Sequence, residues 1–522
     1  MKVANFLENK LGIAFIAFFL ALLAKSGESA ASDGFFGVNA QLFPQNNSFE
    51  MPLLKNAGVQ WVRADFAWYS LEPERGVFNW ERWDQSAAEA QRLGIKILGI
   101  LAYTPDWASQ GGGRNSPPED LNDWEAFVAA AVERYRGKVD AWQIWNEPNL
   151  PGSFSGSVAE YTELVKVAWQ AAKRVNPDCR IVACGPAGVK VGANQPGDTK
   201  GSVFLQGFYA NGGKDFCDVI AIHSYQYNAV PDFSEWWLTE DLRETRRIMA
   251  ESGDAQKPVW ITEIGWSTYQ DGTYSVTEEE QARILLKVFT TACDLGIGKV
   301  FWYNFLSGLD PKDREQNFGL VDGRKNPKPA WWAYKTLTGF INGASGFALK
   351  NLGDGIKAFL LSSNPDKQVW VMWSQENKQA TIPAQGWDRI YQLQQTGTDL
   401  TQLAPTESLT VQLQRDPIYL IFQSDSFGFP SFTIAPNPLF KSKAGEVRFS
   451  YLLLAPAKVS LRLYNLSGQL IARLMAEQWR PEGEHVESWT GAIERRAGPY
   501  LAVMEVKIGA KTMAKKRLFV IQ

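Results

Sequence analysis

Two glutamates in this 522-residue chain stand where apolar stretches end. Glu147 lies in the segment WQIWNEPN (residues 142–149) and Glu263 in WITEIGW (residues 260–266). Proline cannot donate to a strand ladder and keeps its predecessor out of the helical region, so the first strand is expected to run up to Pro148. Two carboxyl groups at two strand ends can hydrolyse a glycosidic bond. Taken alone, Glu147 could equally be a strand-end acid that caps the next helix.

Eight apolar stretches separated by amphipathic segments indicate a repeated strand–helix unit. They lie at residues 36–40, 61–66, 95–101, 139–147, 180–186, 219–225, 258–265 and 300–305. Eight such units over about 300 residues are the size of a (β/α)8 TIM barrel, whose active site lies at the C-terminal ends of the strands. Glu147 would end the fourth strand and Glu263 the seventh, on opposite sides of the barrel mouth. An open, doubly wound sheet is the rival, which the missing Gly-rich phosphate loop disfavours.

The composition excludes several other classes of chemistry. With 45% hydrophobic residues, 21% charged residues and a net charge of −3, the chain is globular and offers no basic field for nucleic acid. The chain has two histidines, His223 and His485, so neither a multi-histidine metal site nor a cofactor is expected. The 21 tryptophans and 16 tyrosines favour a carbohydrate ligand, because aromatic faces pack against the C–H faces of sugar rings.

The N-terminal segment predicts export. Lys2 and Lys10 precede an apolar run at residues 11–24 and three small residues at 29–31, which is the pattern of a signal peptide over residues 1–31. An uncleaved membrane anchor is the alternative, although the run is shorter than the ~20 residues that a spanning helix needs. The mature protein is expected to be secreted or held at the cell surface, with no membrane span.

The hydrophobic period changes to two after the barrel, which is assigned to residues 32–340. Alternating stretches over residues 346–423 predict a small β-sandwich that packs on the barrel, with separate carbohydrate binding as the alternative. Residues 431–522 predict a second all-β domain. The predicted fold class is therefore α/β, a TIM barrel followed by two small all-β sandwich domains. The four cysteines are expected to be buried thiols, with a disulfide between Cys179 and Cys217 left open.

The Trp-Asn-Glu-Pro motif of the fourth strand, together with Glu263 on the seventh, resembles the retaining glycoside hydrolases of clan A over residues 35–340. The segments EPERGVFNW (residues 72–80) and LAYTPDWAS (residues 101–109) are similar to those of family 39 and its relatives. That group includes β-xylosidases, iduronidases and bacterial enzymes that cut exopolysaccharides. The chain departs from the exo-acting members in having no obvious basic cluster for a uronate, which disfavours an iduronidase-like role.

The resemblance implies roles for individual residues. Glu147 would be the general acid/base and Glu263 the nucleophile. The matching substrate-binding side chains at strand ends are Asn146, Arg63, His223, Tyr225 and Trp302. Asn146 would form a hydrogen bond with the sugar 2-hydroxyl, and Arg63 would hold the nucleophile ionised. The ring of Trp302 would lie beneath the sugar at the cleavage point.

Three further aromatic residues near the strand ends are expected to contact sugar: Tyr103, Trp107 and Trp266. Each assignment has a structural alternative. Arg63 could form a purely structural ion pair, Trp302 could belong to the core, and Tyr103 and Trp107 could be loop packing.

The last 85 or so residues carry a second resemblance. The segments APNP (435–438), LYNLSG (463–468), GPY (498–500) and KKRLF (515–519) resemble the C-terminal sorting modules of type IX secretion. They are also similar to the immunoglobulin-like domain of flagellar hook-capping proteins. The resemblance implies secretion machinery as a partner, and a plain interaction domain is the alternative.

The sequence thus predicts a secreted retaining glycoside hydrolase that cleaves O-glycosidic bonds in a polysaccharide or oligosaccharide by two-glutamate double displacement. A catalytically inactive, cell-surface glycan-binding protein on the same barrel is the rival. Transglycosylation would use the same residues. The sugar, its linkage, endo or exo action and the oligomeric state do not follow from the sequence, because loops decide specificity.

Overall fold

The structure is a computed structural model. It describes residues 34–521 apart from 43, 110, 191–198, 227–232, 270–274, 342–345, 365–366, 425–430, 436–445, 454–456, 466–467, 482, 492–496 and 509–510. The predicted signal peptide, residues 1–31, lies outside the described residues. Within the described part of the chain, no helix has the length and apolar character needed to cross a membrane.

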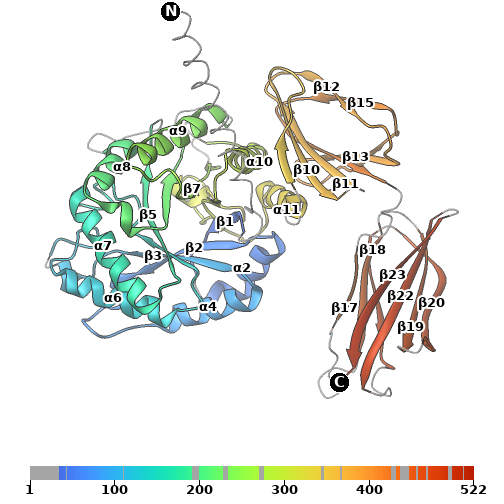
Figure 1. Ribbon diagram of the computed structural model, residues 1–522, viewed down its shortest axis with the longest axis horizontal. Coiled ribbons are helices and arrows are strands. Elements are labelled where there is room, and N and C mark those ends of the chain that lie inside the picture. Colours follow the sequence, from blue (N-terminus) through green and yellow to red (C-terminus); the bar gives the residue numbers. More distant parts are fainter. Residues whose placement is uncertain are drawn as a thin grey trace, which may run out of the picture.

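Eight parallel strands close into a barrel in sequence order, which confirms the predicted TIM barrel (Figure 1). The strands are β1 (Phe36–Asn39), β2 (Trp61–Ala67), β3 (Lys96–Ala102), β4 (Ala141–Ile144), β5 (Arg180–Ala187), β6 (Val219–His223), β7 (Val259–Ile264) and β8 (Lys299–Trp302). Gly37 of β1 lies opposite both Trp61 of β2 and Phe301 of β8, so the sheet has no open edge and is not doubly wound.

The end of β4 differs from the prediction. The strand stops at Ile144, three residues before Glu147, and not at Pro148. Trp145 and Glu147 take positive φ angles of 64° and 44°, which break the extended conformation before the proline is reached. Glu147 therefore stands on a tight turn above the strand end.

Helices cover the outer face of the barrel (Figure 1). They are α2 (Pro44–Asn56), α4 (Glu81–Leu93), α6 (Leu121–Arg134), α7 (Val158–Val175), α8 (Gly201–Ala210), α9 (Glu235–Glu251), α10 (Glu278–Asp294) and α11 (Pro329–Ile341). The four-residue helices α3 (Trp68–Leu71) and α5 (Asp106–Ser109) lie in the connections that follow β2 and β3. Helices α7 and α10 begin with capping boxes, in which Ser157 and Thr277 exchange hydrogen bonds with Glu160 and Glu280. These caps fix where the loops from β4 and β7 end.

The interior of the barrel is apolar at its base and polar at its mouth. A cluster of buried inward-facing residues fills the base, with Trp61, Trp260 and Phe301 in mutual ring contact. Alternate residues of a strand face the same side, so Trp61, Arg63 and Asp65 of β2 face inward at successive heights. The base supports the polar groups above it and closes the barrel from below.

The region after the barrel is all-β, as predicted. One antiparallel sheet has the order β14-β13-β16-β11-β10-β9, and β12 pairs with β15. The strands are β9 (Gly346–Leu349), β10 (Ile356–Asn364), β11 (Lys367–Ser374), β12 (Lys378–Pro383), β13 (Arg389–Gln394), β14 (Thr401–Leu403), β15 (Ser408–Leu413) and β16 (Ile418–Gln423). This region packs on the barrel as expected, since Phe340 of α11 lies 4.9 Å from Tyr419 between ring centroids and Arg283 of α10 pairs with Asp416 at 2.8 Å.

The C-terminal strands form two further antiparallel sheets, ordered β17-β18-β21 and β20-β19-β22-β23. They are β17 (Ser431–Ala435), β18 (Val447–Leu453), β19 (Ala457–Asn465), β20 (Leu470–Arg480), β21 (Gly483–Trp489), β22 (Gly498–Ile508) and β23 (Lys511–Ile521). They enclose a hydrophobic core of their own, which includes Phe449 and Phe519. Parts of the predicted sorting motif, residues 436–438 and 466–467, lie outside the described residues.

All four cysteines are free thiols, so the disulfide left open for Cys179 and Cys217 is not formed. Both side chains are buried. Burial raises the pKa of Cys179 to about 11 and that of Cys217 to about 12, which makes both thiols unreactive at neutral pH.

Candidate active site

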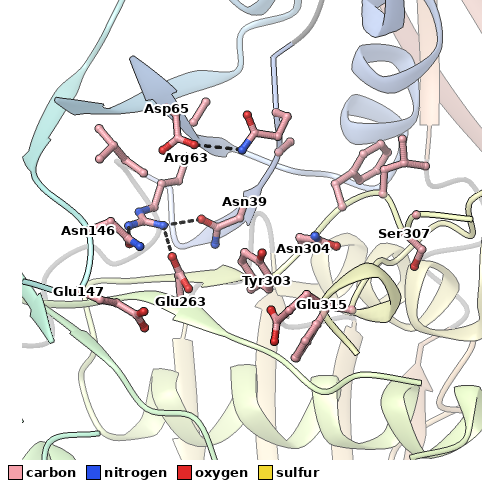
Figure 2. Close-up of a pocket in the computed structure, with 18 of the residues that line it drawn as sticks. Asn39, Arg63, Asp65, Asn146, Glu147, Glu263, Tyr303, Asn304, Ser307 and Glu315 are labelled. Carbon is pink, nitrogen blue, oxygen red and sulfur yellow. Dashed lines mark hydrogen bonds and ion pairs between the residues drawn. The ribbon is translucent and has the colours of Figure 1, made fainter. Parts of the chain in front are cut away.

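A pocket of about 620 Å³ opens at the C-terminal ends of the barrel strands (Figure 2). Its volume is in the usual range of small-molecule sites. The predicted site residues that line it are Arg63, Tyr103, Asn146, Glu147, Tyr225 and Glu263. The structure therefore brings both glutamates into one cavity.

Arg63 is the centre of the hydrogen-bond network beneath this pocket. Its Nη1 donates to Glu263 Oε1 at 2.5 Å and to Asn39 Oδ1 at 2.8 Å. Its Nη2 donates to Asn146 Oδ1 at 2.7 Å, and its Nε donates to Gln143 Oε1 at 2.9 Å. These contacts tie β2 to β1, β4 and β7, so the guanidinium group is fixed from across the barrel.

Glu263, on β7, is held as a carboxylate. The Tyr225 hydroxyl donates to its Oε2 at 2.9 Å, opposite the bond from Arg63, and the imidazole of His223 lies 3.7 Å away. Burial acts to raise the pKa of Glu263. The neighbouring imidazole of His223, the positive charge of Arg63 and the hydrogen bonds from Arg63 and Tyr225 outweigh burial and hold the pKa of Glu263 below its ordinary value. An ionised carboxylate in this position can act as a nucleophile.

Glu147 has a different environment. Its side chain is 18% exposed, and its Oε1 lies 2.9 Å from Nδ1 of the fully buried His223. Nε2 of His223 lies 3.0 Å from the Thr262 hydroxyl. If that hydroxyl donates to Nε2, the proton of the neutral imidazole is on Nδ1 and is donated to Glu147. The left-handed backbone of Glu147 is the kind of local strain that clusters at functional sites.

Glu147, His223 and Glu263 each offer a ligand atom, and these atoms all lie within 4.8 Å of one another. Such a set could hold a metal ion in principle. Here the guanidinium group of Arg63 already bonds Glu263, and a cation would be repelled by it. The arrangement suits proton transfer and nucleophilic attack better than metal binding.

The two tryptophans next to Glu147 do not surround it. Trp142 and Trp145 are fully buried in the hydrophobic core, where Trp142 packs on Phe66 and Trp145 on Phe154. Neither ring lies beside the acid in the pocket, because Trp142 faces outward from β4 and Trp145 turns away at its left-handed backbone.

Trp302 and Trp266 do not lie where the expected contact with the sugar would require them. Their rings stack on each other with centroids 6.0 Å apart, and both are buried. Neither is among the described residues that line the pocket, whereas Tyr303 is. Since Phe301 faces the barrel interior, Trp302 faces outward and Tyr303 turns inward again.

Trp107 also lies outside the pocket lining. Its Nε1 donates to the Glu72 carbonyl at 2.9 Å, its ring meets Trp68 edge-on, and Arg75 covers it at 5.1 Å. These contacts are those of loop packing. Tyr103, by contrast, lines the pocket and has a positive φ of 72°.

Several lining residues were not predicted. Among the polar ones are Asn39, Gln41, Asp65, Tyr303, Asn304 and Glu315. Asp65 faces the pocket two residues after Arg63, and Gln41 Nε2 donates to its carboxylate at 3.1 Å. Burial raises the pKa of Asp65 despite that hydrogen bond. Polar residues at every second position of the otherwise apolar β2, Arg63 and then Asp65, are the signal that would have identified Asp65.

Two family models match the barrel. Residues 32–183 match "Glycosyl hydrolase family 10", and residues 119–334 match "Glycosyl hydrolase catalytic core". An endo-1,4-beta-xylanase A of Fusarium oxysporum f. sp. lycopersici is 29% identical over 137 residues, which are 25% of this chain and 41% of that protein. A putative mannan endo-1,4-beta-mannosidase 9 of Oryza sativa subsp. japonica is 23% identical over 296 residues, 48% of this chain and 69% of that protein. The chain thus matches less than half the length of the xylanase.

Solved structures share the fold. A family 39 glycoside hydrolase from the gut symbiont Bacteroides cellulosilyticus WH2 superimposes with a TM-score of 0.61 at 24% identity, over 74% of this chain and 80% of the other. A glucosidase from Croceicoccus marinus superimposes with a TM-score of 0.58 at 16% identity, over 76% and 98%. The chain therefore has the barrel fold of the clan A glycoside hydrolases.

Proposed function

We propose that this protein is a retaining glycoside hydrolase that cleaves O-glycosidic bonds in a polysaccharide or oligosaccharide. One observation carries the proposal. Glu263 is held ionised by Arg63 and Tyr225, and an oxygen of Glu147, in a different environment, lies within 4.8 Å of it. Two carboxyl groups in one pocket with different surroundings can divide the roles of nucleophile and acid.

In the first step, Glu263 attacks the anomeric carbon as Glu147 protonates the glycosidic oxygen. The bond from that carbon to the leaving oxygen breaks, and an ester between the sugar and Glu263 forms. In the second step, the Glu147 carboxylate takes a proton from water, and the oxygen of that water attacks the anomeric carbon. The ester bond breaks and Glu263 is free again.

The close approach of the two groups fits retention. Retaining enzymes place their carboxyl groups about 5–5.5 Å apart, whereas inverting enzymes leave about 6.5–9.5 Å for a water molecule between carboxylate and sugar. The 4.8 Å limit on the two carboxylate oxygens is in keeping with the closer arrangement. Asn146, fixed by Arg63 at 2.7 Å, is placed to bond the sugar hydroxyl next to the reacting carbon.

The substrate class rests on the relatives and on the pocket. Proteins named as an endo-1,4-beta-xylanase and as a putative mannan endo-1,4-beta-mannosidase match parts of the barrel, which supports a β-1,4-linked polysaccharide. The described pocket lining contains two arginines, Arg63 and Arg314, and Arg63 is already bonded to Glu263. A neutral sugar suits this lining better than a uronate.

Following the anomeric configuration of the first product by NMR tests the proposal. Xylan, mannan and β-glucan are each incubated with the protein, and the spectrum is read before the product anomers equilibrate. A β anomer from a β-linked substrate is expected. An α anomer would mean inversion. Binding of a polysaccharide with no hydrolysis of any of the three would favour the rival, a glycan-binding protein on an inactive barrel.

Export is part of the same proposal. It is supported by the signal-peptide pattern of residues 1–31 and by the resemblance of residues 431–522 to sorting modules. The mass of the protein recovered from a culture medium of its native host would test it. Loss of the first 31 residues is expected, and a protein that stays inside the cell with an intact N-terminus would contradict export.

A further inference from the structure

A second hollow, of about 510 Å³, adjoins the pocket. The two share Tyr103, Asn146 and Glu147 among their lining residues. The residues that line only the second are Asn115, Leu150, Gly152 and Ser153, and we call this cavity the Asn115 hollow. The described lining of the Asn115 hollow contains Glu147 but not Glu263. The two cavities therefore meet at Glu147.

The roles of the two glutamates determine which part of the substrate lies in each cavity. The nucleophile must reach the anomeric carbon, so the sugar that becomes attached to the enzyme lies on the side of Glu263. The acid must reach the oxygen of the leaving group, so the leaving group extends past Glu147. A cavity that continues beyond Glu147, away from Glu263, lies where the leaving group must go.

The walls of the Asn115 hollow are tied together. Asn115 Nδ2 donates to the Gly152 carbonyl at 2.6 Å, and the Asn115 carbonyl accepts from the Ser155 amide at 2.8 Å. Ser153 Oγ donates to the carbonyl of Asn146, the residue before the acid. These bonds join the loop after α5 to the loop after β4, so the hollow is formed without a ligand.

The lining also has the chemistry of a sugar site. Asn115 and Ser153 bring polar side chains, Gly152 brings bare backbone, and Leu150 brings one apolar face. A pyranose ring has hydroxyl groups around its edge and C–H bonds on its faces, so it matches a cavity with both kinds of surface. Beyond the bonds given above, Asn115 Oδ1 and Ser153 Oγ can still accept hydrogen bonds from sugar hydroxyl groups, which an apolar leaving group does not supply.

We propose that the Asn115 hollow binds the sugar unit on the leaving-group side of the cleaved bond. The chain of the substrate then runs through both cavities, with its reducing end toward Gly152, and is cut at an internal bond. This inference rests on the proposed function, because it takes Glu147 as the acid and Glu263 as the nucleophile.

Gly152 offers a way to block the hollow without strain. A Cβ atom added there meets no heavy atom within 4 Å, and the backbone is not in the left-handed region. Gly152→Trp should therefore fold and obstruct the hollow. Gly339 in α11 is the matched control, since a Cβ atom there also meets nothing within 4 Å and the helix lies on the outside of the barrel.

The experiment compares two kinds of substrate made from the same sugar. The β-1,4-linked hexasaccharides of xylose, mannose and glucose place sugar in the hollow, whereas the corresponding β-glycosyl fluorides have a single-atom leaving group. Gly152→Trp should lower kcat/KM for the hexasaccharide about tenfold or more, with fluoride hydrolysis within about twofold of the parent. Asn115→Ala should lower kcat/KM for the hexasaccharide about fivefold, as expected for one lost hydrogen bond. Gly339→Trp should leave kcat/KM unchanged for both substrates.

The outcomes distinguish a failure of this inference from a failure of the proposed hydrolase function. Equal losses on both substrates, or no loss on the hexasaccharide, would overturn the inference and leave the hydrolase intact. Release of single sugars only from the hexasaccharide would also overturn it. Failure of the parent to turn over any hexasaccharide or fluoride would contradict the proposed function and the inference together.

Discussion

Arg63 and Glu263 are joined across the barrel at 2.5 Å, and at most 9% of either side chain is exposed. Removing one partner of a buried ion pair leaves the other charge uncompensated, which costs about 3–5 kcal/mol. We therefore expect Arg63→Ala to lower the free energy of unfolding by that amount in urea titrations at pH 7. Arg174→Ala, which breaks the exposed pair with Glu125, is the control and should cost about 1 kcal/mol or less.

The same variant should change the pH dependence of the reaction. The pKa of Glu263 lies below its ordinary value of 4.5, so the stability that its ionised form contributes is present above pH 4.5 and is lost as the pH falls through the lower, folded-state pKa. Without Arg63, burial is opposed by fewer charges and the pKa should rise. The acid limb of the kcat/KM profile should then move to higher pH. An acid limb that stays in place would show that Arg63 does not hold the nucleophile ionised.

Glu147→Gln should separate the two chemical steps. A good leaving group needs little protonation, so the variant should still attack a dinitrophenyl glycoside in a burst of aryl product. The second step needs a base, so steady-state turnover should fall by roughly 10²–10⁴-fold. Stopped-flow absorbance measures both phases. Loss of the burst itself, in a variant whose circular dichroism matches the parent, would argue against Glu147 as the acid/base.

Asp65→Asn should raise the thermal stability of the protein and weaken substrate binding. Burial raises the pKa of Asp65 above its ordinary value of 3.8, so the stability linked to this group is complete below pH 3.8 and is lost as the pH rises through the folded-state pKa. The amide removes that cost, so Tm should rise at pH 7 by a few degrees, since about 1 kcal/mol corresponds to about 2–4 °C in a larger domain. No gain is expected near pH 3. KM should increase, because Asp65 lines the pocket. A Tm gain of equal size at both pH values would contradict the buried charge as its cause.

Trp302 and Tyr303 offer a test of which aromatic residue meets the substrate. Trp302 is fully buried, and no partner for its Nε1 is found among the described residues, so Trp302→Phe should lose packing worth about 1–3 kcal/mol without changing KM. Tyr303→Ala should instead raise KM. Thermal melts and steady-state kinetics on one substrate check both variants. A raised KM for Trp302→Phe with an unchanged Tm would show that Trp302 contacts the substrate.

The sequence allowed the barrel and the centre of the site to be predicted because both depend on local signals. Each barrel strand is an apolar stretch, and strand ends of a closed parallel barrel meet on one face. That rule was enough to place Glu147 and Glu263 in one pocket with Arg63. It also predicted that His223 ends the sixth strand, but it did not predict that His223 Nδ1 lies 2.9 Å from Oε1 of Glu147.

What the sequence could not provide is the direction of side chains near strand ends. Trp302 and Tyr303 are adjacent aromatic residues, and a shift of one position exchanges the one that faces the pocket. Trp142 and Trp145 likewise turned out to be core residues, because the chain leaves the extended conformation at Trp145. Asn39 and Gln143 were missed since each is a polar residue within an apolar stretch, whose partner, Arg63, lies on another strand.

Covalent labelling of Glu263 is the most direct test of the proposed mechanism. A 2-deoxy-2-fluoro-β-glycosyl fluoride of xylose, mannose or glucose reacts in the first step and stalls in the second, so the sugar ester accumulates. Peptide mass spectrometry should find the added sugar on Glu263, and Glu263→Gln should carry no label and should lose hydrolysis by about 10⁴-fold or more. An adduct on Glu147 instead, or hydrolysis by Glu263→Gln at the parent rate, would contradict the assignment of the nucleophile.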